Sequence, residues 1–523
     1  MKRLTAAALV LCMFFTAFTG CTGNEEEENN DAAIQTAILY EFSKISQIPR
    51  ESGYEKEIST YLRSWAKENG LEGVRDSSNN VIITLPASPG YEDAPVTIIQ
   101  SNMDSKIAVS ADKTFDPLND PVTVTDDGIT LSAEGTSIGA DSGSGMATAL
   151  YILKHARKHG PVRAVFTVNG ESGMTGAEKL NEKYLEGDYL INLSWDSGST
   201  VGIGSGGTAS FDMTHKIEWT APQNAIPYTL SLSGLNGGEA DKDIGKGGAN
   251  AIKVIGEILA NAQGRGILFE LGSFNGGVSR DTIATAASAL IIINESDVNK
   301  MQDLVDDSIE AFGDAYGDVE EHYAFTYQEA QMPEKVVSFE DTGSIISFIY
   351  GILNGVQKMS EEYAGVVESA SNLGMVSTVT GDFICQVTAA SNSDVELYKI
   401  TSAHEAISSM SGLEYTYYEG VPRWPDHSDS VLYSAIRDIF SELYGDKPDG
   451  AIVHHELEFG WFAKKNPRLQ IVSIGPTIEN PGLPDEALVL ETVTRPVNVV
   501  LTFLERINEI GKVSGEPGNE NSN

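Results

Sequence analysis

Apolar residues recur at two different spacings along the chain, and these spacings predict alternating helices and strands. Residues 31–48 and 54–69 carry apolar side chains at helical spacing, and Gly70 is placed to end the second helix. Short runs rich in β-branched residues predict buried strands at 81–85, 96–100, 162–168 and 189–193. Strands that alternate with helices indicate an α/β layer with a largely parallel sheet.

The pattern changes in the middle of the chain and then returns. Between residues 208 and 421 the sequence reads as strands and glycine-rich turns with helical stretches, and the α/β pattern resumes at 422. An insertion inside one α/β domain explains this order. We therefore predict a catalytic-type α/β domain made of 31–207 and 422–512, an inserted lid or dimerisation domain at 208–421, and a disordered polar tail at 513–523.

The first 21 residues have the pattern of an export signal. Lys2 and Arg3 precede an apolar run at 6–18, and small residues come just before Cys21. This order resembles a bacterial lipoprotein cleavage box, with Cys21 as the lipidated first residue and 22–30 as a polar tether. An ordinary signal peptide or an uncleaved anchor is the alternative. We expect an extracytoplasmic lipoprotein that contacts the membrane only through this lipid, because no later segment has the roughly 18 apolar residues of a membrane span.

The composition excludes some classes of binding partner and shows whether a disulfide can form. The chain has 523 residues, of which 41% are apolar and 21% are charged, as expected for a globular protein of more than one domain. A formal net charge of −40 argues against nucleic acid or anionic lipid as a partner. Cys12 leaves with the signal and Cys21 is modified, so Cys385 is alone and no intrachain disulfide is expected.

Glycine surrounds one carboxylate in the stretch 135–146, Gly-Thr-Ser-Ile-Gly-Ala-Asp-Ser-Gly-Ser-Gly-Met. Asp141 lies there just before an apolar helical run, so the backbone can turn sharply and leave its carboxylate at the mouth of a sheet. The alternative is a glycine-rich turn in which Asp141 serves only as a helix N-cap. The polar residues at the ends of the neighbouring strands favour a functional site over a simple helix cap.

Polar side chains follow the predicted strands where each one ends. Asn102 and Asp104 follow the strand at 96–100, Glu171 follows the strand at 162–168, and Asp196 follows the strand at 189–193. Ligands of α/β sheets gather beyond the carboxyl ends of the strands. These residues and Asp141 therefore form one candidate site.

Several blocks in this order resemble a known family, the di-zinc aminoacyl-histidine dipeptidases, or peptidase D group, among the carnosinase-like metallopeptidases. The blocks lie at 75–76 with 80–81, 135–146, 171–174, 234–238, 366–369 with 372–374, 457–460, 473–478 and 484–486. The resemblance covers nearly the whole chain after residue 30. It implies an α/β catalytic domain with an inserted α+β lid and dimerisation domain, a homodimer, and a dipeptide or amino-acid-like ligand.

The resemblance also assigns the metal and catalytic positions. Asp141 matches the bridging metal ligand, Glu171 a further ligand, and Asp104 the aspartate that orients the first histidine. That histidine is replaced by Asn102, and the general base is replaced by Gly170.

Two more ligand positions differ from the family. Ser194 stands where a ligand aspartate is expected, with Asp196 two residues on as a possible substitute. The last ligand histidine falls at Gly482. None of the eight histidines occupies a ligand position, and His155 and His159, four apart on one predicted helix, are best explained as a solvated face.

Substrate-binding positions are partly kept. The resemblance assigns substrate contacts to Glu239, Asn275, Arg280, Trp424 and Glu458. Glu239 replaces the lid histidine, and a carboxylate-gripping arginine of the family aligns with Thr388.

The ligand atoms of the candidate site differ from those of the family and favour a different metal ion. Asn102, Asp141, Glu171 and Asp196 all offer oxygen, which suits a hard divalent cation such as calcium or magnesium better than zinc. Loss of a general base typically costs on the order of 10² to 10⁴ in rate. We therefore expect no zinc and a catalytically inactive or repurposed protein that binds a peptide, an amino acid or a partner protein.

Two alternatives stay open at this point. The first is an active metallo-dipeptidase that hydrolyses Xaa-His or other dipeptides through a rearranged site, with two zinc ions. The second is a purely structural dimer scaffold.

Overall fold

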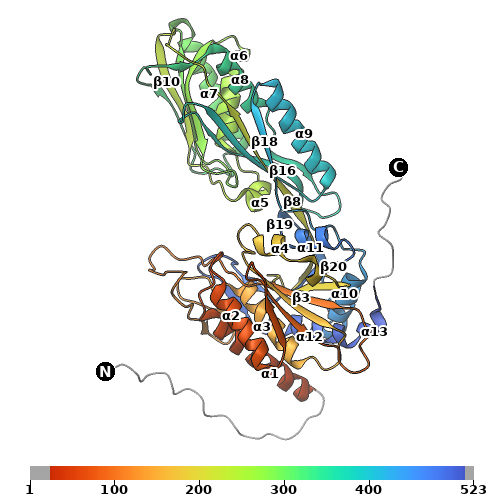
Figure 1. Ribbon diagram of the computed structural model, residues 1–523. Coiled ribbons are helices and arrows are strands. Elements are labelled where there is room, and N and C mark those ends of the chain that lie inside the picture. Colours follow the sequence, from red (N-terminus) through yellow and green to blue (C-terminus); the bar gives the residue numbers. More distant parts are fainter. Residues whose placement is uncertain (1–23, 513–523) are drawn as a thin grey trace, which may run out of the picture.

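The computed structural model describes residues 24–512. Two lobes meet at a narrow waist, with the two ends of the chain in the lower lobe and the middle of the chain in the upper lobe (Figure 1). Cys21 and the predicted tail at 513–523 lie outside the described residues. Within the described part of the chain, no helix is long and apolar enough to cross a membrane.

The lower lobe is built on a mixed sheet. Its strands follow the order β1-β2-β6-β3-β7-β20-β8. β6, β3, β7 and β20 run parallel to one another, whereas β1 and β2 are antiparallel additions at the edge. The bounds are β1 Glu72–Arg75, β2 Val81–Leu85, β3 Thr97–Asn102, β6 Val162–Thr167, β7 Tyr189–Asn192, β8 Thr200–His215 and β20 Gln470–Ser473.

Helices cover both faces of this sheet because its central strands are apolar on both sides. One core joins the sheet to α1 (Asn24–Ser46), α2 (Lys56–Glu68), α3 (Ala140–His155), α10 (Val431–Tyr444), α12 (Thr494–Glu505) and α13 (Ile507–Ile510). A second core packs Ile82, Ile98 and Leu190 against α4 (Thr175–Lys179) and α11 (Phe459–Lys465).

A small antiparallel sheet lies beside the lower lobe. It contains β4 (Thr125–Asp126), β5 (Thr130–Ser132), β21 (Ile478–Glu479) and β22 (Ala487–Val489) in the order β21-β22-β5-β4. This sheet joins the segment before the glycine-rich stretch to the segment that contains Gly482.

The upper lobe is an antiparallel sheet with helices packed into its own core. Its strands are β10 (Ile226–Ser233), β11 (Phe269–Gly277), β12 (Ala287–Ile293), β13 (Ala324–Glu329), β15 (Gly355–Met359), β16 (Val367–Ser377), β17 (Phe383–Ser391) and β18 (Glu414–Glu419), with β9 (Trp219–Thr220) and β14 (Val336–Val337) paired separately. The helices are α5 (Ala240–Asp243), α6 (Ala251–Gly264), α7 (Val298–Tyr316), α8 (Phe339–Gly351) and α9 (Asp394–Met410).

One strand belongs to both lobes. The first part of β8 pairs with β20 and with β19 (Asp449–Glu456), and its second part pairs with β17 and β18. The result is a continuous 16-stranded sheet that runs through the waist.

The structure corrects three local predictions. Helix α1 begins at Asn24, inside the predicted tether, where glutamates of good helix propensity are frequent. Helix α3 begins at Ala140, so Asp141 lies in its first turn and is not its N-cap. The same helix ends at His155, so His159 is not on it; the His159 side chain is buried and its Nδ1 contacts the carbonyl oxygen of Gly160.

Candidate functional site

The carboxyl ends of β3 and β6 face the waist and bring together six ionic or polar side chains. We call this cluster the strand-end site, and it contains Arg50, Asn102, Asp104, Asp141, Glu171 and Glu486. Of the residues predicted from sequence, Asn102, Asp104, Asp141 and Glu171 are members. The strand ends therefore meet as expected for an α/β sheet.

Asp104 is held by four hydrogen bonds. Its Oδ1 accepts from the backbone N–H of Gly170 at 2.7 Å and from Nδ2 of Asn102 at 3.3 Å. Its Oδ2 accepts from Ser52 Oγ at 2.7 Å and from the N–H of Glu171 at 2.9 Å. Asp104 is fully buried, so these bonds are needed to compensate for its lost hydration. The carboxylate thus fixes the loop after β6, which carries Gly170 and Glu171.

Asn102 and Glu171 interact directly. Nδ2 of Asn102 donates to Oε1 of Glu171 at 2.8 Å. Glu171 is exposed as a residue, but desolvation of its carboxylate, together with the negative charges of Asp141 and Asp104, raises its pKa well above the ordinary value. An amide therefore occupies the place of the first metal-binding histidine, and it bonds to the carboxylate beside it.

Asp141 enters the site from the first turn of α3. The residue before the helix, Gly139, has φ of 61°, and a side chain there would collide with Ser105 and Arg50. Burial, and then the negative charge of Glu486, raises the pKa of Asp141 to about 6. The glycine-rich stretch therefore lets a buried arginine approach the helix start while Asp141 faces the other acids.

Sequence reasoning did not assign a role to Arg50. Its guanidinium donates to Ser142 Oγ and to the carbonyl oxygens of Met103, Asp104 and Gly139 at 2.8–3.2 Å. The side chain is buried and partly balances the acids around it. Its partners lie more than 50 positions away in the chain, so no local spacing could have indicated this role.

Glu486 is the second residue without a predicted role. Oε1 accepts from the N–H groups of Ile138 and Ala140 at 3.0 and 2.9 Å, and Oε2 accepts from the N–H of Gly482 at 2.9 Å. Glu486 therefore clamps the Gly482 loop to the start of α3. The block at 484–486 was a sequence signal, but it did not reveal this clamp.

Other predicted ligand positions stand apart from this network. Asp196 is exposed, and no side-chain hydrogen bond joins it to the strand-end site within the described range 24–512. Ser194 Oγ contacts Ser101 Oγ at 2.9 Å. Gly482 contributes only its backbone.

Three predicted substrate contacts are buried or hydrogen-bonded within the protein. Trp424 is 1% exposed and packs in the second core of the lower lobe. Glu458 is 6% exposed and accepts from Gln100 Nε2 and Thr167 Oγ, both at 2.7 Å, and burial raises its pKa to about 7. Asn275 Oδ1 accepts from the N–H of Thr378 at 3.0 Å within the upper sheet.

Arg280 and Glu239 are already paired in the upper lobe. Arg280 donates to Asp212 Oδ1 at 2.9 Å and lies over the ring of Tyr418. Glu239 forms an ion pair with Lys242 of α5 at 2.8 Å. The charge of Lys106, from the lower lobe, also lowers the pKa of Glu239, so this part of the lid faces the lower lobe.

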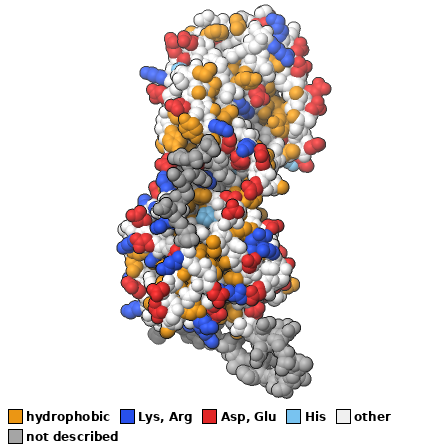
Figure 2. Space-filling view, turned by 90° about the vertical axis from the view of Figure 1, so that its right-hand side faces the viewer, with side chains coloured by type: hydrophobic (Ala, Val, Ile, Leu, Met, Phe, Trp, Pro, Cys, Tyr) orange, Lys and Arg blue, Asp and Glu red, His pale blue; other side chains and the backbone are white. Residues whose placement is uncertain are grey.

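Charged side chains lie at the waist. In Figure 2 acidic side chains are scattered over both lobes, and some of them lie close to the waist. His455 of β19 lies there near Asp241 and Lys242 of α5 and near Asp196, and burial lowers its pKa.

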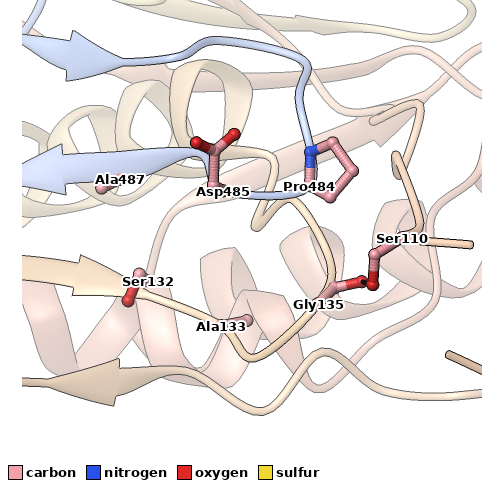
Figure 3. A pocket seen from close by; sticks show the side chains of 7 residues that line it. All are labelled: Ser110, Ser132, Ala133, Gly135, Pro484, Asp485 and Ala487. Carbon is pink, nitrogen blue, oxygen red and sulfur yellow. Dashed lines mark hydrogen bonds between the residues drawn. The ribbon is translucent and has the colours of Figure 1, made fainter. Parts of the chain in front are cut away.

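Two cavities lie outside the strand-end site. One of about 550 Å³ is lined by Ser110, Ser132, Ala133, Gly135, Pro484, Asp485 and Ala487. Figure 3 shows Ser110 directed at Gly135, whose carbonyl oxygen accepts its hydroxyl at 3.1 Å, with Pro484 and Asp485 on the adjoining segment. The second, of about 400 Å³, lies in the upper lobe and includes Glu239 and Asp243. Neither is lined by a carboxylate of the strand-end site.

The side chains present do not reproduce a pair of zinc sites. Within residues 24–512, no group of three or more His, Cys, Asp or Glu side chains is arranged to hold a metal ion. Gly482 has no side chain, and the Asn102 amide is bonded to Glu171.

Comparison with known proteins gives consistent matches. Residues 107–506 match the model of Peptidase family M20/M25/M40. The chain is 29% identical over 468 residues to the cytosol non-specific dipeptidase of Escherichia coli strain K12, covering 89% of this chain and 96% of that protein. It resembles the crystal structure of aminoacylhistidine dipeptidase from Vibrio alginolyticus with a TM-score of 0.80 and 31% identity, covering 91% and 97% of the two chains. A Bacillus cereus aminopeptidase shares the fold, with a TM-score of 0.53, 14% identity and coverage of 91% and 99%.

These comparisons confirm the predicted fold and correct two other predictions. The expectation of no zinc is contradicted, because the matching group is the one for which the resemblance implies two zinc ions. The extracytoplasmic, membrane-anchored location is contradicted as well, because the Escherichia coli relative is named a cytosol dipeptidase.

Proposed function

Because the chain belongs to the peptidase family M20/M25/M40, we propose that it binds dipeptides or closely related amino-acid compounds at the strand-end site. Two relatives that match it over nearly their whole length are named dipeptidases. At the waist, α5 of the upper lobe packs against β19 (Figure 1).

The carboxylate of Asp141 is the observation that carries this proposal. It accepts no side-chain hydrogen bond from the described residues, and its pKa of about 6 reflects burial beside other acids. A dipeptide has a free ammonium group at neutral pH, which would compensate for this excess of negative charge. The ammonium group would donate to the Asp141 carboxylate, because the oxygens of Asp104 and Glu486 already accept from backbone N–H groups.

We infer binding without hydrolysis as the primary activity of this chain. Gly170 occupies the position of the general base and cannot take a proton from water. Asn102 also cannot act as a base, because its amide is neutral and bonds to Glu171. Loss of a general base costs on the order of 10² to 10⁴ in rate, so a residual reaction would be slow.

Dipeptide hydrolysis is the second candidate function, and the full-length similarity to two dipeptidases favours it. In that case Glu171 would be the group that exchanges protons, since its pKa is raised well above the ordinary value.

The test measures binding and turnover separately. Titration calorimetry with Ala-Ala and Ala-His reports binding, and chromatographic detection of free amino acids reports hydrolysis, each with and without added zinc. The comparison variant carries Asn102→His, Gly170→Glu and Gly482→His together. We expect the unmodified protein to bind and not to cleave. Cleavage by the unmodified protein would establish the second candidate, and absence of binding under all conditions would refute both.

We also propose that the upper lobe forms a homodimer contact. Within residues 24–512, strand β13 pairs with β10 alone and lies at the end of the 16-stranded sheet, so its outer edge could pair with a strand of a second copy. Light scattering over a range of concentrations tests this, and a monomer at every concentration contradicts it.

A further inference from the structure

The loop that follows β6, residues 168–171, is fixed by side chains from other segments. Each of its four backbone N–H groups donates to a side-chain oxygen: Val168 to Asn80 at 3.0 Å, Asn169 to Glu55 at 2.8 Å, and Gly170 and Glu171 to Asp104 at 2.7 and 2.9 Å. Backbone N–H groups that leave water need such partners, and here neither a helix nor a strand supplies them. The conformation of this loop therefore depends on three side chains that are distant in the sequence.

Asn169 is the turning point of the loop. Its φ of 60° lies in the left-handed region, which residues other than glycine seldom adopt unless surrounding contacts hold them there. Its side-chain Nδ2 donates to Thr175 Oγ at 3.1 Å, and its backbone N–H donates to Glu55. Glu171, which bonds to Asn102, comes two residues later. A change of backbone conformation at Asn169 would therefore displace the Glu171 carboxylate within the strand-end site.

Glu55 is placed to cap a helix but binds this loop instead. It is the residue just before α2, where a side-chain oxygen ordinarily accepts an N–H of the same helix, and it makes no such bond. Its Oε1 accepts from the N–H of Gly53 at 2.9 Å and from the N–H of Asn169 at 2.8 Å. Glu55 is 4% exposed, so water cannot readily replace it as the acceptor. A local rule is broken here beside the candidate site, which is where such departures are expected.

We propose that Glu55 is a positioning residue of the strand-end site: it orders the 168–171 loop and so places the Glu171 carboxylate for ligand binding. This inference rests on the proposed dipeptide binding. Within residues 24–512 the Glu55 side chain has no hydrogen bond to Asn102, Asp141 or Glu171, so it acts through the backbone of Asn169. Outer partners of this kind orient the groups that contact a ligand, and in metal sites their loss typically costs about 10- to 100-fold.

The experiment compares three substitutions that separate the length of the Glu55 side chain from its charge. Glu55→Ala removes the acceptor. Glu55→Gln keeps the length and one oxygen but removes the charge, whereas Glu55→Asp keeps the charge on a side chain that is one methylene shorter. Glu57→Ala is the matched control, because Glu57 is an exposed acid in the first turn of the same helix.

Two measurements are made on each protein. Hydrogen exchange followed by mass spectrometry, without ligand, reports the protection of residues 168–171 and of strand β3 as a reference. Titration calorimetry with Ala-Ala reports the affinity. We expect Glu55→Ala to raise the exchange rate of the loop and to lower the affinity, each by about tenfold or more, while β3 keeps its protection. Glu55→Gln should retain most of both values, Glu55→Asp should resemble Glu55→Ala, and Glu57→Ala should match the unmodified protein.

Several results would overturn this role. Unchanged loop exchange or unchanged affinity in Glu55→Ala would show that Glu55 does not position the site. Recovery by Glu55→Asp without recovery by Glu55→Gln would assign the effect to charge, and faster exchange of β3 as well would assign it to the whole lobe. Dipeptide binding by the unmodified protein would stand in all of these cases. If Ala-Ala does not bind the unmodified protein, the proposed function itself fails, and the ligand role of Glu55 fails with it.

Discussion

A Cβ atom at position 170 would lie 2.6 Å from the Cβ atom of Asn102 and 3.0 Å from its amide group. A side chain at position 170 would therefore occupy the space that the Asn102 side chain fills at the end of β3. The two positions that the resemblance assigns to a general base and a metal ligand are occupied by residues that fit each other. A return to the family residues requires both positions to change together.

The first prediction concerns this pair. Gly170→Ala should destabilise the protein by about 1–3 kcal/mol, the usual cost of overpacking. In an Asn102→Gly background most of this cost should disappear, since the opposing side chain is gone. Urea unfolding of the four proteins gives the coupling energy. Gly343→Ala in α8 is the control, because a Cβ atom there meets nothing within 4 Å. Equal costs in both backgrounds would show that the two positions are independent.

The second prediction tests the clamp made by Glu486. Glu486→Gln should cost about 1–3 kcal/mol, because an amide NH₂ would replace an oxygen that accepts a backbone N–H. Asp485→Asn is the control, since Asp485 is its neighbour and is bonded only to the side chain of Asn480 at 3.0 Å. Thermal unfolding measures both. A loss of similar size in the control would locate the effect in the loop as a whole and not in the clamp.

The third prediction is a pH dependence. Burial raises the pKa of Glu458 from 4.5 to about 7 in the folded protein. The folded state therefore holds this proton more tightly than the unfolded state, and stability is lost as pH rises from about 4.5 to about 7. The shift corresponds to about 3 kcal/mol.

Glu458→Gln should remove this contribution to the pH dependence, so the variant should gain stability relative to the unmodified protein between pH 5 and pH 8. Urea unfolding at several pH values checks it. Glu414→Gln is a suitable control, because Glu414 is exposed. Parallel stability curves for Glu458→Gln and the unmodified protein would contradict the shifted pKa.

The fourth prediction concerns the buried cation. Arg50→Lys should destabilise the protein by about 1–3 kcal/mol, because the positive charge is kept but buried oxygen atoms lose their hydrogen-bond donors. A lysine cannot reproduce the planar fork that reaches Ser142, Gly139 and Met103 together. Arg75→Lys provides the comparison, since Arg75 makes one long bond to Thr60 Oγ at 3.3 Å on the surface. Chemical unfolding of the two variants measures the difference, and equal stabilities would refute the role of Arg50.

The fold was predictable because apolar periodicity is local. The β-branched runs that end near Asn102 and before Asn169 are strands β3 and β6. Because these strands are parallel, the polar residues that follow them lie close together. Side-chain partnerships were not predictable in the same way. Arg50 reaches Ser142 across 92 positions, and only the folded chain shows that contact.

The motif matches identified positions of interest but could not show whether the side chains at those positions are exposed. Trp424 and Glu458 lie in recognisable blocks, yet both are buried, and their recurrence in a motif is explained by packing as readily as by ligand contact. Glycine was more informative than the polar residues. Position 139 needs a glycine because its φ is positive and because Arg50 approaches it closely. Both reasons can be seen only in the folded structure. Domain boundaries and ligand roles stay predictions.

Strand β8 connects the two lobes as part of a hydrogen-bonded sheet and not as a flexible loop. A loop linker would let the lobes rotate freely, but here rotation must bend a hydrogen-bonded strand that is paired on both sides of the waist. The hydrogen-bonded sheet itself therefore sets the angle between the two lobes, and a change of that angle would strain the ladders on both sides of the waist.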